Sequence, residues 1–514
     1  MLKTLISIND SINTFVWVTV GLVLLIGTGL LTTFMTDFFQ VTHIGHWFKS
    51  TIGSIFDKKV SGHTKDKGAI SQFQSLCTAL AATIGVGNIA GVAAAIVSGG
   101  PGAIFWMWVA AFFGMMTNYS ENVLGIFYRR RNSNREWSGG AMYYLADGFG
   151  SFEITDNLGK KHSLKTFGKV LAFLFSVFAV LASFGIGNMG QVNKIVLNFK
   201  SAFPIDALNN VTLYNNITLY NLIAGLILVI LAGTIIIGGL KRIAEFAEKV
   251  IPFMVILFLI GSFTVIFVHI ANIGAAFKAI FASAFTAKAA WGAAGGIALK
   301  TVITWGFKRG VFSNEAGLGS SVMVHSNSNV AEPVRQGMWG IFEVFVDTMI
   351  VCTLTALVIL TSGVVDLSSG AMALGLDGDA TLVSAAFSTV FGSVGSKFIA
   401  VCILLFAFTT VLGWSHYGAK SIEYLAGEKS VKIYKIIFTL MIVSGALMTS
   451  SIAWDISDTF NGLMMIPNLI GVIILSGTVR KITKNYIDRI LHKKDIKPML
   501  SAFEDIQKDM EKKI

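Results

Sequence analysis

Charged residues are scarce in this chain, and their scarcity excludes most soluble proteins. Asp, Glu, Lys and Arg make up 13% of its 514 residues, whereas a typical soluble domain carries about 25%. Hydrophobic residues make up 54%, and the mean hydropathy is +0.69. No polar stretch is long enough to form a second, soluble domain. The composition therefore predicts an all-α polytopic membrane protein.

Residues that carry enzymatic or redox chemistry are also few. Cys77, Cys352 and Cys402 lie inside apolar segments, so we interpret them as small core residues rather than disulfide partners or metal ligands. The sequence contains no P-loop, HExxH, CxxC or nucleophile-elbow motif. His325 and His416 lie near the ends of apolar segments, where interfacial histidines are expected. We therefore expect neither an enzyme nor a cofactor.

Apolar runs of about 20 residues, long enough to cross a bilayer, recur along the chain. We predict eleven membrane spans, at 14–36, 70–97, 103–128, 167–192, 219–240, 250–271, 292–326 (broken), 336–362, 383–415, 431–450 and 452–478. Lys and Arg gather in the connections on one side of these spans, as the positive-inside rule requires. That asymmetry predicts a plasma (inner) membrane protein with its N-terminus outside and its C-terminus in the cytoplasm. It also accounts for the net charge of +11 without a nucleic-acid partner.

The predicted spans form two groups of five, preceded by one extra span. Because five is odd, the second group begins on the opposite side of the membrane, which is the parity of an inverted repeat. The predicted organisation is an N-terminal span (1–36), a cytoplasmic loop (37–69), a first five-helix repeat (70–271), an outer interfacial connection (272–291), a second, inverted repeat (292–478) and a cytoplasmic tail (479–514). The long ninth span is expected to include an outer piece, and the basic tail to rest near anionic membrane lipid.

Each group begins with an apolar segment that glycines interrupt. The first reads ALAATIGVGNIAGVAA at 79–94, and the second reads GFKRGVFSNEAGLGSS at 306–321. Glycine destabilises a helix by about 1 kcal/mol relative to alanine, and free backbone groups in lipid are costly unless they line a polar cavity. Two such breaks at corresponding places indicate a transporter's binding site. Close helix packing through small residues is the alternative for either break alone.

The first break contains groups that suit a small zwitterion and a cation. A helix that restarts inside the membrane exposes N–H groups carrying about half a positive charge, which favour a carboxylate. The carbonyls of the unwound stretch suit sodium. Gly85 and Gly87 permit the backbone geometry, Asn88 offers a side-chain oxygen, and Thr83 offers a hydroxyl.

The second break adds an aromatic wall and further polar groups. Phe312 is expected to wall a pocket, and Ser313 and Asn314 to supply oxygens to an ion or ligand. Glu315 either satisfies loose N–H groups or pairs with Arg309 in a structural ion pair, since charges this deep in an apolar segment are costly.

Two more acidic residues lie within the predicted membrane. Glu121 and Asp347 occupy corresponding spans of the two groups. We expect each carboxylate to accept N–H groups from an unwound segment, with proton relay as the alternative.

Polar residues in the fourth and ninth spans complete the candidate set. Gln191 has donors and an acceptor that suit an amine or a carboxylate. Thr409 and Thr410 offer adjacent hydroxyls for a monovalent cation, unless they bond back to their own helix. Trp414, one turn further on, is expected to cap a small apolar side chain.

These residues lie in strings that resemble the alanine/glycine:cation symporter family, the sodium:alanine symporters. The strings include ALAATIGVGNIAGVA at 79–93, GIGNMGQVN at 185–193, KRGVFSNEAGLGSS at 308–321 and LGWSHYGAKSIEYLAG at 412–427. The resemblance implies sodium-coupled uptake of small neutral amino acids, alanine or glycine, by alternating access. It also implies the broken-helix, inverted-repeat fold of neurotransmitter:sodium symporters, with an additional span.

The resemblance further implies roles for individual residues. The implied substrate-binding residues are Thr83, Val86, Gly87, Asn88, Gln191, Phe312, Asn314 and Trp414, with the amides of Val86 and Gly87 meeting the carboxylate. The implied sodium ligands are the carbonyls of Ala81 and Ile84 with Thr409 and Thr410, and a second site near Asn88 and Ser313. The chain departs from the family pattern at Ala69, Val86 and Ala141, which leaves ion stoichiometry and substrate preference open. Proton-coupled amino-acid transport, or a channel or sensor on the same fold, are the alternative functions.

Overall fold

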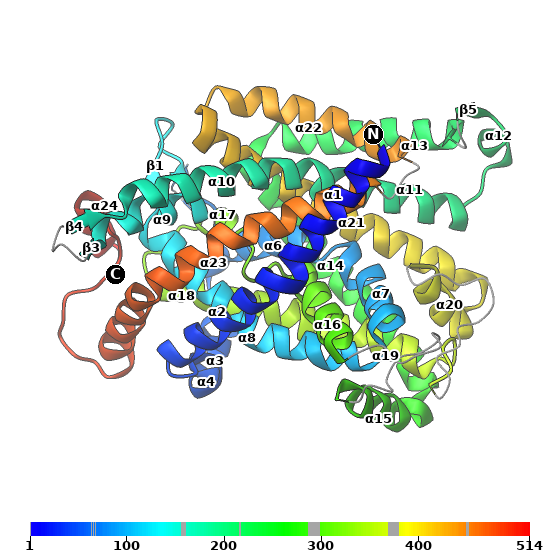
Figure 1. Ribbon diagram of the computed structural model, residues 1–514, viewed down its shortest axis with the longest axis horizontal. Coiled ribbons are helices and arrows are strands. Elements are labelled where there is room, and N and C mark those ends of the chain that lie inside the picture. Colours follow the sequence, from blue (N-terminus) through cyan, green and yellow to red (C-terminus); the bar gives the residue numbers. More distant parts are fainter. Residues whose placement is uncertain are drawn as a thin grey trace.

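The computed structural model describes residues 2–62, 64, 66, 68–155, 161–214, 217–285, 299–367, 380–448 and 452–514. Helices dominate this part of the chain (Figure 1). Its strands form two-stranded antiparallel hairpins: β1 (Arg130–Arg131) with β2 (Trp137–Ser138), β3 (Glu153–Thr155) with β4 (Lys161–Ser163), and β5 (Thr212–Tyr214) with β6 (Ile217–Thr218). The predicted all-helical architecture is therefore confirmed, apart from these short hairpins.

Eight helical stretches in the described residues are long and apolar enough to cross a membrane: Ile6–Met35, Lys165–Ala202, Leu219–Ile236, Gly239–Val268, Pro333–Thr361, Ser393–Ala426, Ser430–Leu447 and Asp455–Leu491. Each overlaps a predicted span. The other three predicted spans fall on the broken pair α6 (Gln72–Thr83) and α7 (Ala90–Gly99), on α8 (Gly102–Phe127), and on the broken pair α16 (Leu299–Asn314) and α17 (Val322–His325). Residues 292–298 of the last span lie outside the described residues. The count of eleven and the inverted repeat remain predictions.

Four of these eight stretches are composite, and the other four are single α-helices. They comprise α1 (Leu2–Thr14), η1 (Phe15–Val20) and α2 (Gly21–Met35); α10 (Lys165–Phe184), η5 (Gly185–Met189) and α11 (Gly190–Ala202); α13 (Leu219–Ile236); α14 (Gly239–Val268); α18 (Pro333–Val344), η7 (Phe345–Cys352) and α19 (Thr353–Thr361); α21 (Ser393–Ala426); α22 (Ser430–Leu447); and α23 (Ile452–Tyr486) with η8 (Ile487–Leu491). The π-helical segments η5 and η7 are wider turns of the kind often found at functional sites.

Several boundaries differ from the predicted ones. α14 begins at Gly239 rather than at 250, because the charged residues 241–249 continue the helix beyond its apolar part. The outer piece expected in the ninth span is a separate helix, α20 (Ala380–Phe391). The predicted outer connection contains η6 (Ile270–Asn272) and α15 (Ile273–Ala284), and its residues 286–291 lie outside the described residues.

The first glycine break divides its span into two helices. α6 (Gln72–Thr83) begins with a capping box, in which the Ser71 hydroxyl accepts from the Gln74 amide and the Gln74 side chain accepts from the Ser71 amide. Ile84 and Gly85 are extended, η3 (Val86–Asn88) forms one tight turn, and α7 (Ala90–Gly99) resumes the helix. The chain therefore unwinds where the glycines predicted.

The second break is shorter than its sequence suggests. α16 (Leu299–Asn314) stays helical through the first half of the 306–321 string, and the chain unwinds only after Asn314. Glu315, Gly317 and Gly319 adopt positive φ angles of 57°, 91° and 72°, which glycine tolerates far better than other residues. The short helix α17 (Val322–His325) follows.

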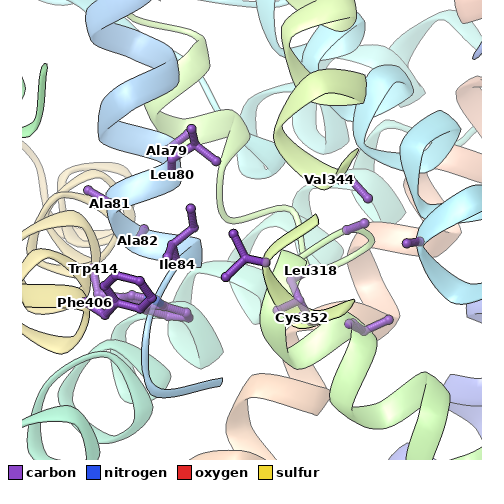
Figure 2. Close-up of a cluster of buried hydrophobic side chains, with 14 of the residues drawn as sticks. Ala79, Leu80, Ala81, Ala82, Ile84, Leu318, Val344, Cys352, Phe406 and Trp414 are labelled. Atoms are coloured by element: carbon purple, nitrogen blue, oxygen red, sulfur yellow. The ribbon is translucent and has the colours of Figure 1, made fainter. Parts of the chain in front are cut away.

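α6 lies at the centre of the molecule. It packs against α14, α18 and α21, while α16 packs against α7 and α8. Figure 2 shows Ala79–Ile84 with Phe406 and Trp414 of α21 on one side and with Leu318 and Cys352 on the other. The two broken segments thus face each other across a buried core.

Short elements cover the end of the molecule that carries the C-terminus, which we call the C-terminal face. They are α3 (Phe39–Thr42), α4 (Ile44–Ser50), η2 (Ile52–Ser54), α5 (Lys58–Ser61), α9 (Ala141–Gly148), η4 (Phe149–Ser151) and α24 (Glu504–Glu511). One further short helix, α12 (Asp206–Asn209), follows α11. The tail, which the sequence predicts to rest near anionic lipid, packs against the protein itself. Leu500, Ile506 and Met510 pack against Ala69 and Trp137 (Figure 1, red helix).

Candidate functional site

The unwound turn of the first break exchanges helical hydrogen bonds for side-chain ones. The Gly85 amide donates to Asn88 Oδ1 at 2.9 Å, and the Val86 amide donates to Gln191 Oε1 at 3.3 Å. In an uninterrupted helix these two amides would bind the carbonyls of Ala81 and Ala82. Those carbonyls are therefore released, and a buried carbonyl without a helical partner favours a cation.

Two threonines of α21 lie beside this turn. Thr409 Oγ1 donates to the carbonyls of Leu405 and Phe406 at 3.0 and 2.9 Å, and Thr410 Oγ1 donates to Phe406 at 3.0 Å. Both hydroxyls therefore bond back to their own helix. Because each uses its hydrogen in this way, its oxygen lone pairs remain available as acceptors.

Glycines allow α21 and α6 to approach closely. A Cβ atom at Gly413 would lie 2.6 Å from the Cβ of Ala82, and one at Gly85 would lie 2.6 Å from Thr410 Oγ1. The Thr410 hydroxyl therefore lies against the unwound turn, whereas Thr409 Oγ1 lies 3.8 Å from Met254 Sδ of α14.

A second polar cluster joins the two breaks directly. Asn88 Nδ2 donates to Ser313 Oγ at 2.8 Å and to Asp347 Oδ1 at 2.6 Å. Ser313 and Thr348 donate to Asp347 Oδ2 at 2.7 and 2.8 Å. All four side chains are fully buried. The structure thus brings the expected pair Asn88 and Ser313 together, with Asp347 between them.

Asn314 is directed away from the other predicted substrate-binding residues. Its side-chain nitrogen donates to Thr348 Oγ1 at 2.9 Å, and its oxygen accepts from the Ala316 amide at 2.9 Å. The side chain therefore supports the second break instead of facing the cavity described next.

A small cavity of about 20 Å³ lies between the breaks. It is lined by Ala82, Thr83, Gly85, Gly87, Ile186, Gln191, Phe312, Glu315, Thr410, Trp414 and Asn461. A Cβ atom at Gly87 would lie 3.0 Å from the Phe312 ring, and one at Gly187 would lie 2.4 Å from Trp414. Two glycines and two aromatic rings thus keep the cavity small, which limits the side chain of any ligand.

Glu315 bonds to the cavity wall and not to Arg309. Its Oε1 accepts from Trp414 Nε1 at 2.9 Å, and its Oε2 accepts from Ser320 Oγ. Arg309 instead lies over the rings of Trp305 and Phe312, 5.0 and 5.5 Å from their centroids. The expected structural ion pair is therefore wrong, because the left-handed turn at Glu315 carries its carboxylate toward α21.

Glu121 lies outside this cavity and supports the second break from α8. It accepts from Asn468 Nδ2, which also donates to the Gly317 carbonyl at 2.8 Å. The other carboxylate oxygen, Oε2, is buried without a hydrogen-bond partner among the described residues. Glu121 is therefore linked to the unwound segment through Asn468 and not through backbone N–H groups, whereas the oxygens of Asp347 accept from side chains of both breaks.

The structure adds residues that sequence reasoning missed. Asn461 of α23 lines the cavity, and among the described side chains its Oδ1 is buried without a hydrogen-bond partner. The sequence predicted His325 to be interfacial. It is instead fully buried and contacts Glu343 Oε2 at 2.9 Å. An isolated asparagine or glutamate inside an apolar span is the signal that identifies such residues.

The long apolar helices and the small cavity between two broken helices are features of a multi-pass membrane transporter. Residues 2–501 match the sodium:alanine symporter family. The chain belongs to this family, and it is a transporter and not an enzyme.

Several relatives align along nearly their whole length. The sodium/alanine symporter AgcS of Methanococcus maripaludis is 41% identical over 481 residues, which cover 94% of this chain and 97% of the relative. The probable sodium/glutamine symporter GlnT of Bacillus subtilis is 36% identical, covering 92% and 89%. The putative sodium/proton-dependent alanine carrier YrbD of Bacillus subtilis is 33% identical, covering 93% and 91%.

Proposed function

We propose that this protein couples sodium entry to the uptake of small neutral amino acids, alanine and glycine, by alternating access. The observation that carries the proposal is the small cavity between two facing breaks, bordered by released carbonyls and by free hydroxyl lone pairs. Membership of the sodium:alanine symporter family supports the same substrate class. In this proposal the chain crosses the plasma membrane as one extra span followed by two inverted five-helix repeats, with the N-terminus outside.

The substrate carboxylate binds the amides of Val86 and Gly87 at the start of the resumed helix. Because Gln191 Oε1 accepts from the Val86 amide, the carboxylate takes over that bond and Gln191 turns its amide nitrogen toward the ligand. The unpaired Oδ1 of Asn461 then accepts a hydrogen bond from the substrate. Its hydrogen bond removes the cost of an unsatisfied buried polar group, about 1–3 kcal/mol.

One sodium ion binds between α6 and α21, to the carbonyls of Ala81 and Ile84 and to the hydroxyls of Thr409 and Thr410. A second binds at the cluster formed by Asn88, Ser313 and Asp347. Oxygen ligands suit a hard cation, and the first site shares the unwound turn with the substrate. Sodium binding therefore orders the turn that presents the substrate amides, which couples the two ligands.

Uptake into proteoliposomes tests the proposal. An inward sodium gradient should drive accumulation of labelled alanine, and unlabelled glycine should compete while glutamine and phenylalanine should not. Accumulation that follows a pH gradient without sodium would instead establish proton coupling, and the buried carboxylates of Glu121 and Asp347 are the groups to test in that case. Flux far above carrier turnover would indicate a channel, and binding without accumulation a sensor.

A further inference from the structure

The C-terminal face contains a second cavity, separate from the ligand site. Its volume is about 360 Å³, and its lining includes Ala69, Ile70, Asn327 and His416. We call it the vestibule. On α21, His416 follows Thr409 by two helical turns, about 10.5 Å along the axis. The vestibule therefore lies in line with the proposed sodium site.

The inner ends of the two broken helices meet at the edge of the vestibule. The Ile70 amide donates to the Asn327 carbonyl at 3.0 Å, and the Asn329 amide donates to the Ile70 carbonyl at 2.9 Å. Ile70 directly precedes the N-cap of α6, and Asn327 follows α17 by two residues. This short parallel pairing between Ile70 and Ser328 ties both breaks together on the C-terminal face.

Arg129 holds one side of this pairing. Its side chain is 1% exposed, and its guanidinium donates to the carbonyls of Ser326 at 3.2 Å, Ser328 at 2.6 Å and Val330. The same guanidinium lies 3.9 Å from the centre of the Trp137 ring. Arg129 is therefore a positioning residue that fixes three carbonyls of the strand following α17.

The C-terminal tail packs beside Arg129 and next to the pairing. Ile506 and Met510 of α24 pack with Leu500 against Ala69 and Trp137. The tail is also bonded to the protein through its backbone, since the Ala502 amide donates to the Phe127 carbonyl at 2.9 Å. Arg129 Nη2 contacts Met510 Sδ at 3.9 Å.

Ala69 links the tail to the vestibule. It packs against the tail cluster and also lines the vestibule, one residue before the pairing at Ile70. Separation of the two inner ends on this face moves Ala69. That movement breaks the apolar contacts between Ala69 and the tail.

We propose that the tail, residues 498–511, and Arg129 form a latch that holds the Ile70–Ser328 pairing closed and slows opening of the C-terminal face. The latch gives this face a regulatory element, since release of the tail raises the rate at which the vestibule connects to the site. The latch rests on the proposed alternating-access function, but what it changes directly is the stability of the Ile70–Ser328 backbone pairing.

Hydrogen–deuterium exchange of the purified full chain measures that stability directly. In the double variant Ile506→Ser, Met510→Ser, peptides covering 68–71 and 326–330 should exchange about tenfold faster, because the loss of buried apolar contacts favours the open pairing by that order. A chain ending at Ile496 should behave in the same way and guarantees that the tail is absent. Arg129→Lys should accelerate the same peptides while the tail stays protected.

The matched control is Lys508→Ser with Lys512→Ser on the exposed face of α24, where the side chains are 66% and 76% exposed. It should leave exchange at 68–71 and 326–330 unchanged. Unchanged exchange in the chain ending at Ile496 would overturn the latch. Sodium-driven alanine uptake is measured on the same preparations. If uptake does not depend on sodium but exchange still rises, the proposed function fails and the latch stands.

Discussion

Replacement of Gly87 by alanine should convert the protein from an alanine carrier into one that favours glycine. A Cβ atom at this position would lie 3.0 and 3.2 Å from two carbons of the Phe312 ring. The new methyl group therefore occupies the space between the broken helix and the aromatic wall. Gly87 and Phe312 both line the cavity, so the added methyl group competes with the methyl group of the substrate for the same space.

The magnitude follows from the value of one methyl group in a closed apolar pocket, about 1–3 kcal/mol, or about 10- to 200-fold in discrimination. Initial rates of labelled alanine and glycine uptake in proteoliposomes give the ratio of the two kcat/KM values. We expect that ratio to fall by about tenfold or more in Gly87→Ala, mainly through loss of alanine transport.

Gly91→Ala is the matched control for this experiment. Gly91 lies one turn further along the same broken span, and a Cβ atom there would have 4.0 Å to its nearest neighbour, the Arg309 side chain. Gly91→Ala should therefore keep the alanine-to-glycine ratio of the unmodified protein. A ratio in Gly87→Ala within about twofold of the control would refute the steric argument.

Three other substitutions test separate parts of the site. Thr410→Val keeps the side-chain shape but removes the oxygen. The sodium concentration for half-maximal uptake should then rise by about tenfold, the effect of losing about 1.4 kcal/mol. An unchanged sodium dependence would exclude this oxygen as a ligand. Asn468→Leu leaves Glu121 and the Gly317 carbonyl without their shared donor. The free energy of unfolding should fall by about 1–3 kcal/mol for each of these groups. A melting temperature like that of the parent would contradict this role. Trp414→Phe removes the 2.9 Å hydrogen bond to Glu315 but retains a ring, so its alanine uptake should fall. Trp414→Leu removes both, so its alanine uptake should fall further. Equal uptake in the two variants would argue against a separate role for the ring.

The positions of the two breaks were predictable from the sequence, because their cause is local. Gly85 and Gly87 weaken a helix wherever they occur, and Gly317 and Gly319 tolerate the positive φ angles that the second break requires. The extent of the second break was not predictable. The helix continues to Asn314, because packing of α16 against α7 and α8 outweighs the weak propensity of the glycines.

The partners of the polar residues depended on tertiary structure. For Glu315 the sequence left two alternatives, loose N–H groups of the break or an ion pair with Arg309, yet Glu315 binds Trp414, 99 residues away. Asp347 was identified as an isolated carboxylate, and only the fold shows that it accepts from Asn88 across 259 residues. Contacts between residues so far apart in the chain produce no periodic pattern in a single sequence.

The sequence by itself determined that this protein lies in a membrane, where its helices are interrupted, and which family it resembles. Hydropathy, glycine content and motif strings are properties of consecutive residues, so they can be read without the fold. Only the tertiary structure decided which residues line the cavity, Asn461 among them, and that the C-terminal tail docks beside Ala69. These contacts join segments hundreds of residues apart, and the packing of helices sets them.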